Sequence, residues 1–271
     1  MKKKKKIGRY LYYGIHNVKE GMINPVFWVA VILNAFVIYS TQETDTGSRI
    51  DMLEGVQTAF IVGKASYYVP VCVSLPGVMA FFDEKSNGAY RYKLLRTRRL
   101  VYVFRQVSRS MISGAGVMLF SFIMYSMVML LLSMGNGVPV IFSGIQDYYG
   151  EKVNIYVRLM ADGRGWLVYL MHGSWLMFYA MVWPAFGVAV SAFVKNRKFS
   201  LASPFLLKRL LVYMIADEAV VLNFENLRLT GGVENLPLAG YPYALIYCLC
   251  LLFFCVVIVY MGLRIFLRKN G

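Results

Sequence analysis

The sequence predicts an all-α integral membrane protein with six transmembrane helices and both termini in the cytoplasm. Of its 271 residues, 58% are hydrophobic and only 16% are charged, and the mean hydropathy is +0.54. Soluble globular domains hold about 45 to 50% apolar and about 25% charged residues. The charges also fall in short blocks between long apolar runs, an arrangement typical of multi-pass chains. We therefore expect a single transmembrane domain, 1–271, in the cytoplasmic membrane.

The net charge of +15 does not indicate a nucleic-acid partner. A nucleic-acid binder gathers Lys and Arg on one polar surface, whereas here they separate apolar runs. The four cysteines all fall inside apolar runs, which favours a packing role over a disulfide framework. Cys248 and Cys250 lack the spacing and the histidine partners of a metal site. No metal or cofactor is expected in this chain.

The first segment, 7–22, shows apolar residues at helical spacing behind a run of lysines. They are Ile7, Leu11, Ile15, Val18 and Met22. The opposite face is polar, so we expect an amphipathic helix on the inner membrane surface, bound by apolar burial and by anionic lipid. A cleaved signal peptide is not expected, because its apolar core would begin sooner and end at a small-residue cleavage site.

Six apolar runs are long enough to cross a bilayer. They cover 23–40, 60–82, 110–134, 166–194, 199–224 and 241–266. Pro70, Pro76 and Pro184 predict kinks. The small residues of 110–116 predict close approach of another helix. The segments between the spans are expected to be polar loops, and the first polar segment, 41–66, overlaps the entry to the second span at about Phe60.

The distribution of Lys and Arg predicts the orientation. If the chain has six spans, both termini and two of the connections lie on one side of the membrane and hold 23 Lys and Arg residues. The three loops on the other side hold 6. Because Lys and Arg are retained on the cytoplasmic side, both termini are expected there.

A charged cytoplasmic segment, 83–105, joins the second and third expected spans. It opens with the carboxylates Asp83 and Glu84 and is rich in Lys and Arg beyond Gly88. Apolar residues at 94, 95 and 100 and the length of the segment favour a helix with one apolar side. A simple connecting turn is the alternative.

Two motifs carry a family resemblance. Glu84-Lys85-x-x-Gly88-x-Tyr90 resembles the Glu-Lys/Arg-x-x-Gly signature of ABC-2 type transporter permeases, the membrane subunits of bacterial ABC exporters, and 94–99 resembles its continuation. The stretches 194–199 and 203–207 are similar to the basic link and Pro-Phe start of the fifth helix in small bacterial members. With the amphipathic helix, six spans and inside termini, the resemblance extends over nearly the whole chain.

The resemblance implies a permease subunit that exports a peptide, lipid-like or drug-like substrate. A separate ABC ATPase would bind ATP and Mg, and two permease chains, identical or different, would enclose the path. The residues implied in ATPase coupling are Asp83, Glu84, Lys85, Gly88, Tyr90 and Arg91, with Gly88 either a turn or a close-approach point. The chain itself is not expected to be an enzyme. Thr58 stands where a P-loop ending in Gly63-Lys64 needs glycine.

Four charges interrupt the fifth expected span. They are Lys208, Arg209, Asp217 and Glu218. One interpretation is that they snorkel to the two interfaces and shorten the apolar core. The other is that they line the transport path, where the acidic pair would favour a cationic substrate.

Three other classes compete with the permease. A secondary carrier needs coupling-ion sites and usually shows repeated halves, and no convincing repeat is seen. An intramembrane enzyme is disfavoured because the chain has only two histidines and no His-Glu-x-x-His. A membrane binding or immunity protein would use the same charged segment, so the sequence does not separate it from the permease.

Overall fold

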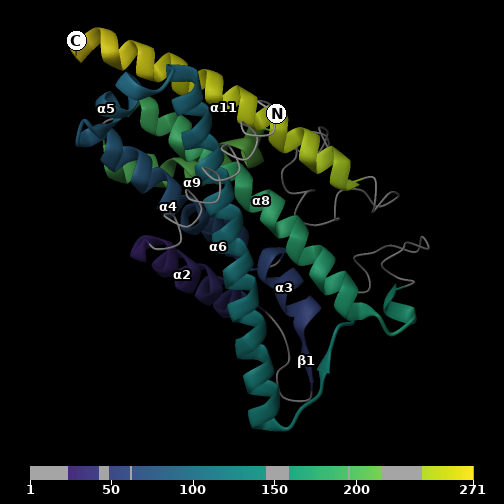
Figure 1. Ribbon diagram of the computed structural model, residues 1–271. Coiled ribbons are helices and arrows are strands. Elements are labelled where there is room, and N and C mark those ends of the chain that lie inside the picture. Colours follow the sequence, from purple (N-terminus) through teal and green to yellow (C-terminus); the bar gives the residue numbers. More distant parts are fainter. Residues whose placement is uncertain are drawn as a thin grey trace, which may run out of the picture.

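The computed structural model describes residues 24–42, 49–61, 63–144, 159–194, 196–214 and 240–270, which are mostly helical (Figure 1). The expected interfacial helix at 7–22 lies outside these ranges, as do Asp217 and Glu218.

Four helices of the described residues are long and apolar enough to cross a membrane. They are α4 (Ala65–Ser86), α6 (Arg99–Asn136), α8 (Gly165–Phe193) and the segment Cys248–Ile265 of α11 (Gly240–Asn270). A fifth helix, α2 (Pro25–Thr41), is apolar but shorter. The chain is thus a mostly helical protein with membrane-spanning character. Six spans and cytoplasmic termini stay predictions.

The helix bounds differ most from expectation around the charged segment. Helix α4 continues through Asp83 and Glu84 to Ser86, and α6 already begins at Arg99. Only the short α5 (Ala89–Arg96) lies between them. The segment 83–105 is therefore the end of one long helix, a short crossing helix and the start of another. Hydropathy marks where polarity begins, but Lys, Arg and Gln are good helix formers and do not end a helix.

Local signals explain two helix ends. Asn24 Oδ1 accepts a hydrogen bond from Val26 N at 3.0 Å, with Pro25 in the first turn, so α2 begins with a capping side chain and a preset φ. Helix α6 ends at Gly137, whose φ of +66° is readily adopted only by glycine. Helix α9 (Arg197–Met214) covers the first part of the fifth expected span, whose remainder is outside the described residues.

The segment expected as a polar loop between the first two spans holds a buried helix. Strand β1 (Ile50–Asp51) leads into α3 (Met52–Ile61), and β1 pairs in parallel with β2 (Val140–Ile141). The expectation of a loop was therefore wrong at 50–61, and the all-α class gains a small strand pair. Leu53, Val56 and Phe60 are all buried and form an apolar stripe on α3. The acidic residues of the segment made it look polar in sequence and concealed this stripe.

Asp51 holds this part of the fold together. Its Oδ1 accepts from Leu53 N and Glu54 N at 3.1 Å each, which caps the N-terminus of α3. Its Oδ2 accepts from the backbone N–H groups of Ser143 and Gly144 at 3.0 Å each and from the Ser143 hydroxyl. One buried carboxylate thus joins α3 to the chain that follows α6.

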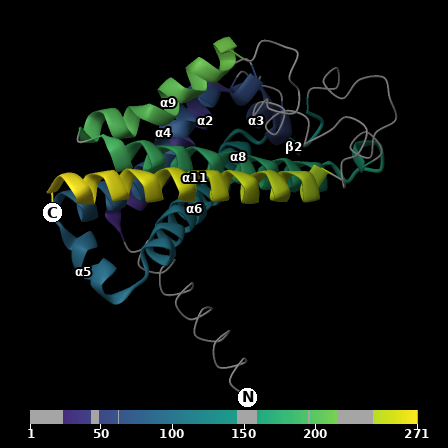
Figure 2. The ribbon, with the colours of Figure 1, turned by 90° about the horizontal axis from the view of Figure 1, so that it is seen from above.

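The described helices have two distinct ends. At one end, the last turn of α4 lies against the α8–α9 junction, because Lys85 contacts Ser191 and Asp83 contacts Arg197. Helix α5 and the start of α6 lie at the same end, because both contact Glu84. We call this the elbow end. The strand pair and the start of α8 lie at the opposite end, where Gly165 meets Phe142. Figure 2 shows α11 running along α8, and Figure 1 places the C-terminus near α5.

Small residues let α6 approach its neighbours, as the sequence indicated. A Cβ at Gly114 would lie 2.5 Å from Pro184 Cγ and 2.7 Å from the Ala180 oxygen of α8. A Cβ at Gly77 of α4 would lie 2.6 Å from Ser110 Cβ. This prediction is confirmed, since both contacts bring helix backbones together at the small-residue run of α6.

We expect Gly114→Ala to destabilise the protein by about 1 to 3 kcal/mol, because the added methyl overlaps α8. The matched control is Gly135→Ala in the same helix, where an added Cβ meets nothing within 4 Å. Thermal unfolding in mild detergent measures both variants. Equal unfolding temperatures for the two would show that α6 and α8 are not in close contact at Gly114.

Candidate functional site

Lys85 joins the end of α4 to the end of α8. The residue is only 7% exposed, and its Nζ donates to the carbonyl oxygens of Ser191 at 2.7 Å, Ala192 at 3.0 Å and Val194 at 3.3 Å. The last carbonyls of a helix have no N–H partner within it, and a cation there also meets the negative end of the helix dipole. Lys85 therefore acts inside the protein and does not lie on an outer docking surface.

Glu84 joins α4 to both of the following helices. Its Oε1 accepts from Lys93 Nζ of α5 at 2.5 Å, and its Oε2 accepts from Tyr102 OH at 3.1 Å and Gln106 Nε2 at 2.6 Å, both in α6. The Glu84 side chain is 15% exposed. We call these four residues the Glu84 latch. Charge-assisted hydrogen bonds in a mostly covered site are stronger than surface pairs, so the latch fixes the angle of α5.

The turn between α4 and α5 depends on Gly88. Its φ is +70°, in the left-handed region, and an added Cβ would meet nothing within 4 Å. Of the two roles left open by the sequence, the structure assigns Gly88 to the turn, because space around it is not limiting. A residue with a side chain would be strained there by its backbone alone.

Tyr90 and Arg91 follow this turn and differ in burial. Tyr90 is 2% exposed and belongs to the apolar core, while Arg91 is exposed. Arg91 Nε donates to Tyr90 OH at 3.2 Å, and this hydrogen bond raises the pKa of Arg91 further above its ordinary value. The guanidinium is thus held against the ring and stays charged at any physiological pH.

Asp83 makes a weaker contact. Its Oδ2 lies 3.6 Å from Arg197 Nη2 at the start of α9, and both side chains are about half exposed. An exposed pair of this kind contributes about 0 to 1 kcal/mol. Both carboxylates of the elbow therefore face cations of this chain.

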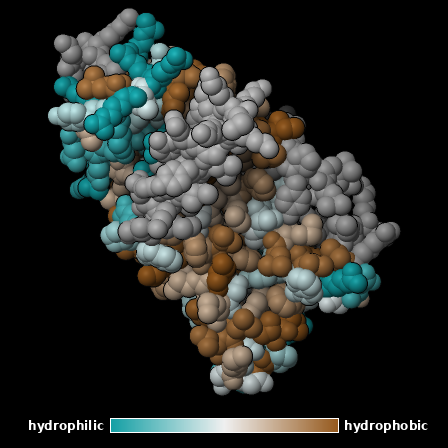
Figure 3. Space-filling model, in the orientation of Figure 1, coloured by the Kyte–Doolittle hydropathy of each residue, from teal (hydrophilic) through white to brown (hydrophobic). Residues whose placement is uncertain are grey.

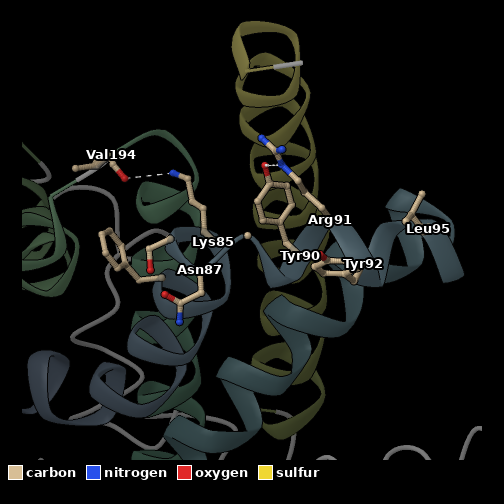
Figure 4. Close-up of a pocket in the computed structure, with 10 residues that line it drawn as sticks. Lys85, Asn87, Tyr90, Arg91, Tyr92, Leu95 and Val194 are labelled. Carbon is tan, nitrogen blue, oxygen red and sulfur yellow. Dashed lines mark hydrogen bonds between the residues drawn. The ribbon is translucent and has the colours of Figure 1, made fainter.

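A cavity of about 910 Å³ opens between the end of α4, α5 and Val194. Figure 4 shows the side chains of Lys85, Tyr90 and Arg91 pointing to the same side, with Asn87 directed away from them. Phe82, Tyr92 and Leu95 complete much of the lining. The elbow cavity thus has cationic and apolar walls.

The corner between α5 and α6 presents a basic and apolar outer surface. Leu95 is 84% exposed and Leu100 is 61% exposed, whereas Leu94 packs against the core. Arg96, Arg98 and Arg99 are exposed beside them. We call these five exposed residues the corner surface. Figure 3 shows hydrophilic residues gathered at the elbow end, above a more hydrophobic body.

Lys208 of the fifth expected span is buried among three helices. It is 2% exposed, and its Nζ donates to the Ser66 oxygen at 2.5 Å and to Tyr179 OH at 3.4 Å. Its Nζ and the exposed Arg209 guanidinium both lie over the Tyr67 ring, at 4.7 Å and 4.3 Å from the centroid. These cation–π contacts add to the hydrogen bonds.

Pro70 explains why Lys208 is directed at Ser66. In a helix the Ser66 oxygen would accept from the N–H four residues later, but that residue is proline, which has no N–H. Tyr179 OH also donates to the same oxygen, at 3.2 Å. In lipid no water is at hand to satisfy a freed carbonyl, so side chains of neighbouring helices must do so. Lys208 is therefore a structural donor, a role that neither sequence interpretation included.

Sequence reasoning named Glu84 and Lys85 but missed the α6 partners of Glu84 and the α8 carbonyls that Lys85 contacts. Tyr102 and Gln106 are four residues apart in a charged helix start, so one face of α6 already offered two hydrogen-bonding groups. The Ser66 site also had a signal, because every helical proline frees the carbonyl four residues earlier. Among the described residues, no group of three or more His, Cys, Asp or Glu is placed to hold a metal ion.

Comparison with known proteins does not assign the chain to a family. A scan against family models, a search of curated proteins and a search of solved structures each found no match.

We expect Lys208→Met to destabilise the protein by about 1 to 3 kcal/mol, because the Ser66 carbonyl loses a donor in a buried site. Pro70→Ala supplies an N–H to that carbonyl and should recover part of this loss in the double variant. Pro76→Ala is the control, since Pro76 lies in the same helix but frees a different carbonyl. Thermal unfolding compares the unchanged protein, Lys208→Met and the two double variants that add Pro70→Ala or Pro76→Ala. Recovery by Pro76→Ala equal to that by Pro70→Ala would contradict the assignment.

We expect Glu84→Gln to speed hydrogen exchange of the α5 amides, because the ion pair to Lys93 is lost and a charged acceptor becomes neutral. Asp83→Asn removes the exposed contact to Arg197 and should change α5 exchange little. Exchange followed by mass spectrometry compares residues 89–96 in the two variants. Unchanged protection in Glu84→Gln would show that the latch does not hold α5.

Proposed function

We propose that this chain is the permease subunit of an ATP-driven exporter in the cytoplasmic membrane, of the ABC-2 type that its motifs resemble. The observation that carries the proposal is the elbow. A short helix, α5, crosses the ends of spanning helices and is joined to α4 and α6 through the Glu84 latch, while Lys85 joins α4 to α8. A partner that moved α5 would therefore move three long helices with it.

The partner on this proposal is a separate ATPase that binds ATP and Mg. It docks on the corner surface, where Leu95 is the most exposed apolar residue of α5 and the exposed Arg96, Arg98 and Arg99 follow it closely in the chain. A surface that combines exposed apolar side chains with arginine suits a protein interface. Because the cations of this surface are Arg and both elbow carboxylates contact cations of this chain, the complementary groove on the ATPase should be acidic.

The six residues implied by the resemblance then divide into two roles. Asp83, Glu84 and Lys85 fix the elbow to the helix bundle and transmit its movement, and Gly88 forms its turn. Tyr90 anchors α5 to the core, and Arg91 lies at the surface nearest to a partner. A second permease chain, identical or different, encloses the path, and the substrate is a peptide, lipid-like or drug-like molecule.

Affinity purification of the full chain in mild detergent tests the proposal. We expect a stoichiometric P-loop ATPase to co-purify and to hydrolyse ATP. Arg98→Glu with Arg99→Glu should lower its recovery at least about tenfold, because like charges then face each other in the interface. The matched control is Arg105→Glu with Lys198→Glu, which makes the same charge change at two exposed residues outside the corner surface and outside the Asp83 pair.

Membrane insertion should be equal in both double variants, and this is checked by fractionation. A chain that purifies alone and shows no associated ATP hydrolysis would overturn the permease and favour a carrier or a binding protein. Loss of the ATPase in both double variants alike would instead remove the corner surface as its specific docking site.

A further inference from the structure

The elbow cavity lies where the apolar part of α4 gives way to charge. Its wall includes Phe82, at the end of the apolar run, and Lys85, Ser86 and Asn87, which come after Asp83 and Glu84. Val194, the C-terminal cap of α8, closes another side. If α4 and α8 cross a bilayer, this level is the boundary between acyl chains and headgroups. The cavity is therefore within reach of lipid headgroups.

The charge of the cavity wall is positive. Arg91 is exposed and held in place by Tyr90 OH, and Lys85 faces the same side (Figure 4). The three carbonyls around Lys85 Nζ are neutral groups, so no carboxylate is paired with it in these three contacts. The nearby carboxylates of Asp83 and Glu84 contact Arg197 and Lys93. An anion in the cavity thus meets a positively charged wall.

Besides Ser86 and Asn87, much of the remaining wall is apolar or aromatic. Phe82, Leu95 and Val194 are apolar, and Tyr92 is 74% exposed. A free inorganic anion would contact only the cationic residues and gain nothing from the apolar ones. A molecule with an anionic head and a hydrocarbon tail contacts both the cationic and the apolar residues. Basic pockets between membrane helices, with tyrosine at the interface, suit anionic lipid headgroups.

We propose that the elbow cavity binds an anionic phospholipid of the adjoining leaflet. Arg91 binds the headgroup phosphate, Lys85 adds positive charge from behind, and the first part of an acyl chain lies against Phe82 and Leu95. The guanidinium of arginine presents a planar pair of N–H donors that matches two phosphate oxygens. This site is distinct from the corner surface in its cationic residues, and it does not depend on the presence of an ATPase.

Native mass spectrometry of the purified full chain tests the proposal. Delipidated protein is mixed with phosphatidylglycerol or with phosphatidylcholine of the same acyl chains. We expect a bound phosphatidylglycerol at lipid concentrations about tenfold below those needed for phosphatidylcholine. Arg91→Gln should remove this preference. Arg105→Gln, an exposed arginine of α6 outside the cavity lining, should keep it.

Two further measurements separate recognition of a lipid phosphate from damage to the fold and from binding of a free anion. Arg91→Lys keeps the charge and should recover part of the preference, which a general structural effect of the substitution would not allow. Glycerol 1-phosphate has the headgroup phosphate without a tail and should not displace the lipid at equal concentration. Equal binding of the two lipids, unchanged preference in Arg91→Gln, or full displacement by glycerol 1-phosphate would each overturn the phospholipid site.

Discussion

The buried ammonium group of Lys85 is the constraint from which the rest of the elbow follows. A charge out of contact with water is tolerated only where its donors are satisfied, and here three carbonyls at the end of α8 do this. Adjacent helical residues point about 100° apart, so fixing Lys85 toward α8 directs Glu84 to another side, where α5 and α6 lie. The last turn of α4 thus contacts three other helices through two neighbouring side chains of opposite charge.

Backbone carbonyls also need donors where a proline interrupts a helix, because proline has no N–H to offer them. The Ser66 oxygen, freed by Pro70, accepts from Lys208 and Tyr179, while the Ser200 oxygen, freed by Pro204, accepts from Ser203 Oγ at 2.8 Å. The first solution reaches across helices and the second is local. Only the contact to the Ser66 oxygen makes the packing of α4, α8 and α9 depend on a single charged residue, Lys208. It therefore requires these three helices to lie side by side.

The sequence predicted best the features that depend only on the order of residues along the chain, such as the ends of an apolar helix. Hydropathy located α8 to within a residue at each end, because Trp166 and Val194 mark abrupt changes in polarity. It failed at α3, where Asp51 and Glu54 suggested solvent although one of them is a buried cap. The motif singled out Glu84 and Lys85, but their roles depend on which helix ends lie beside them, and spacing along the chain does not contain that information.

Asp51 clamps the end of the bundle opposite the elbow, since it joins α3 to the chain leaving α6. Because the Glu84 latch holds α6 near its start, α6 acts as a lever whose 38 residues extend for about 57 Å at about 1.5 Å per residue. A tilt of about 5° at the elbow then displaces the far end of a helix this long by about 5 Å. A displacement of that size exceeds the roughly 4 Å that separates side chains in contact, so it would have to break the Asp51 contacts at the far end.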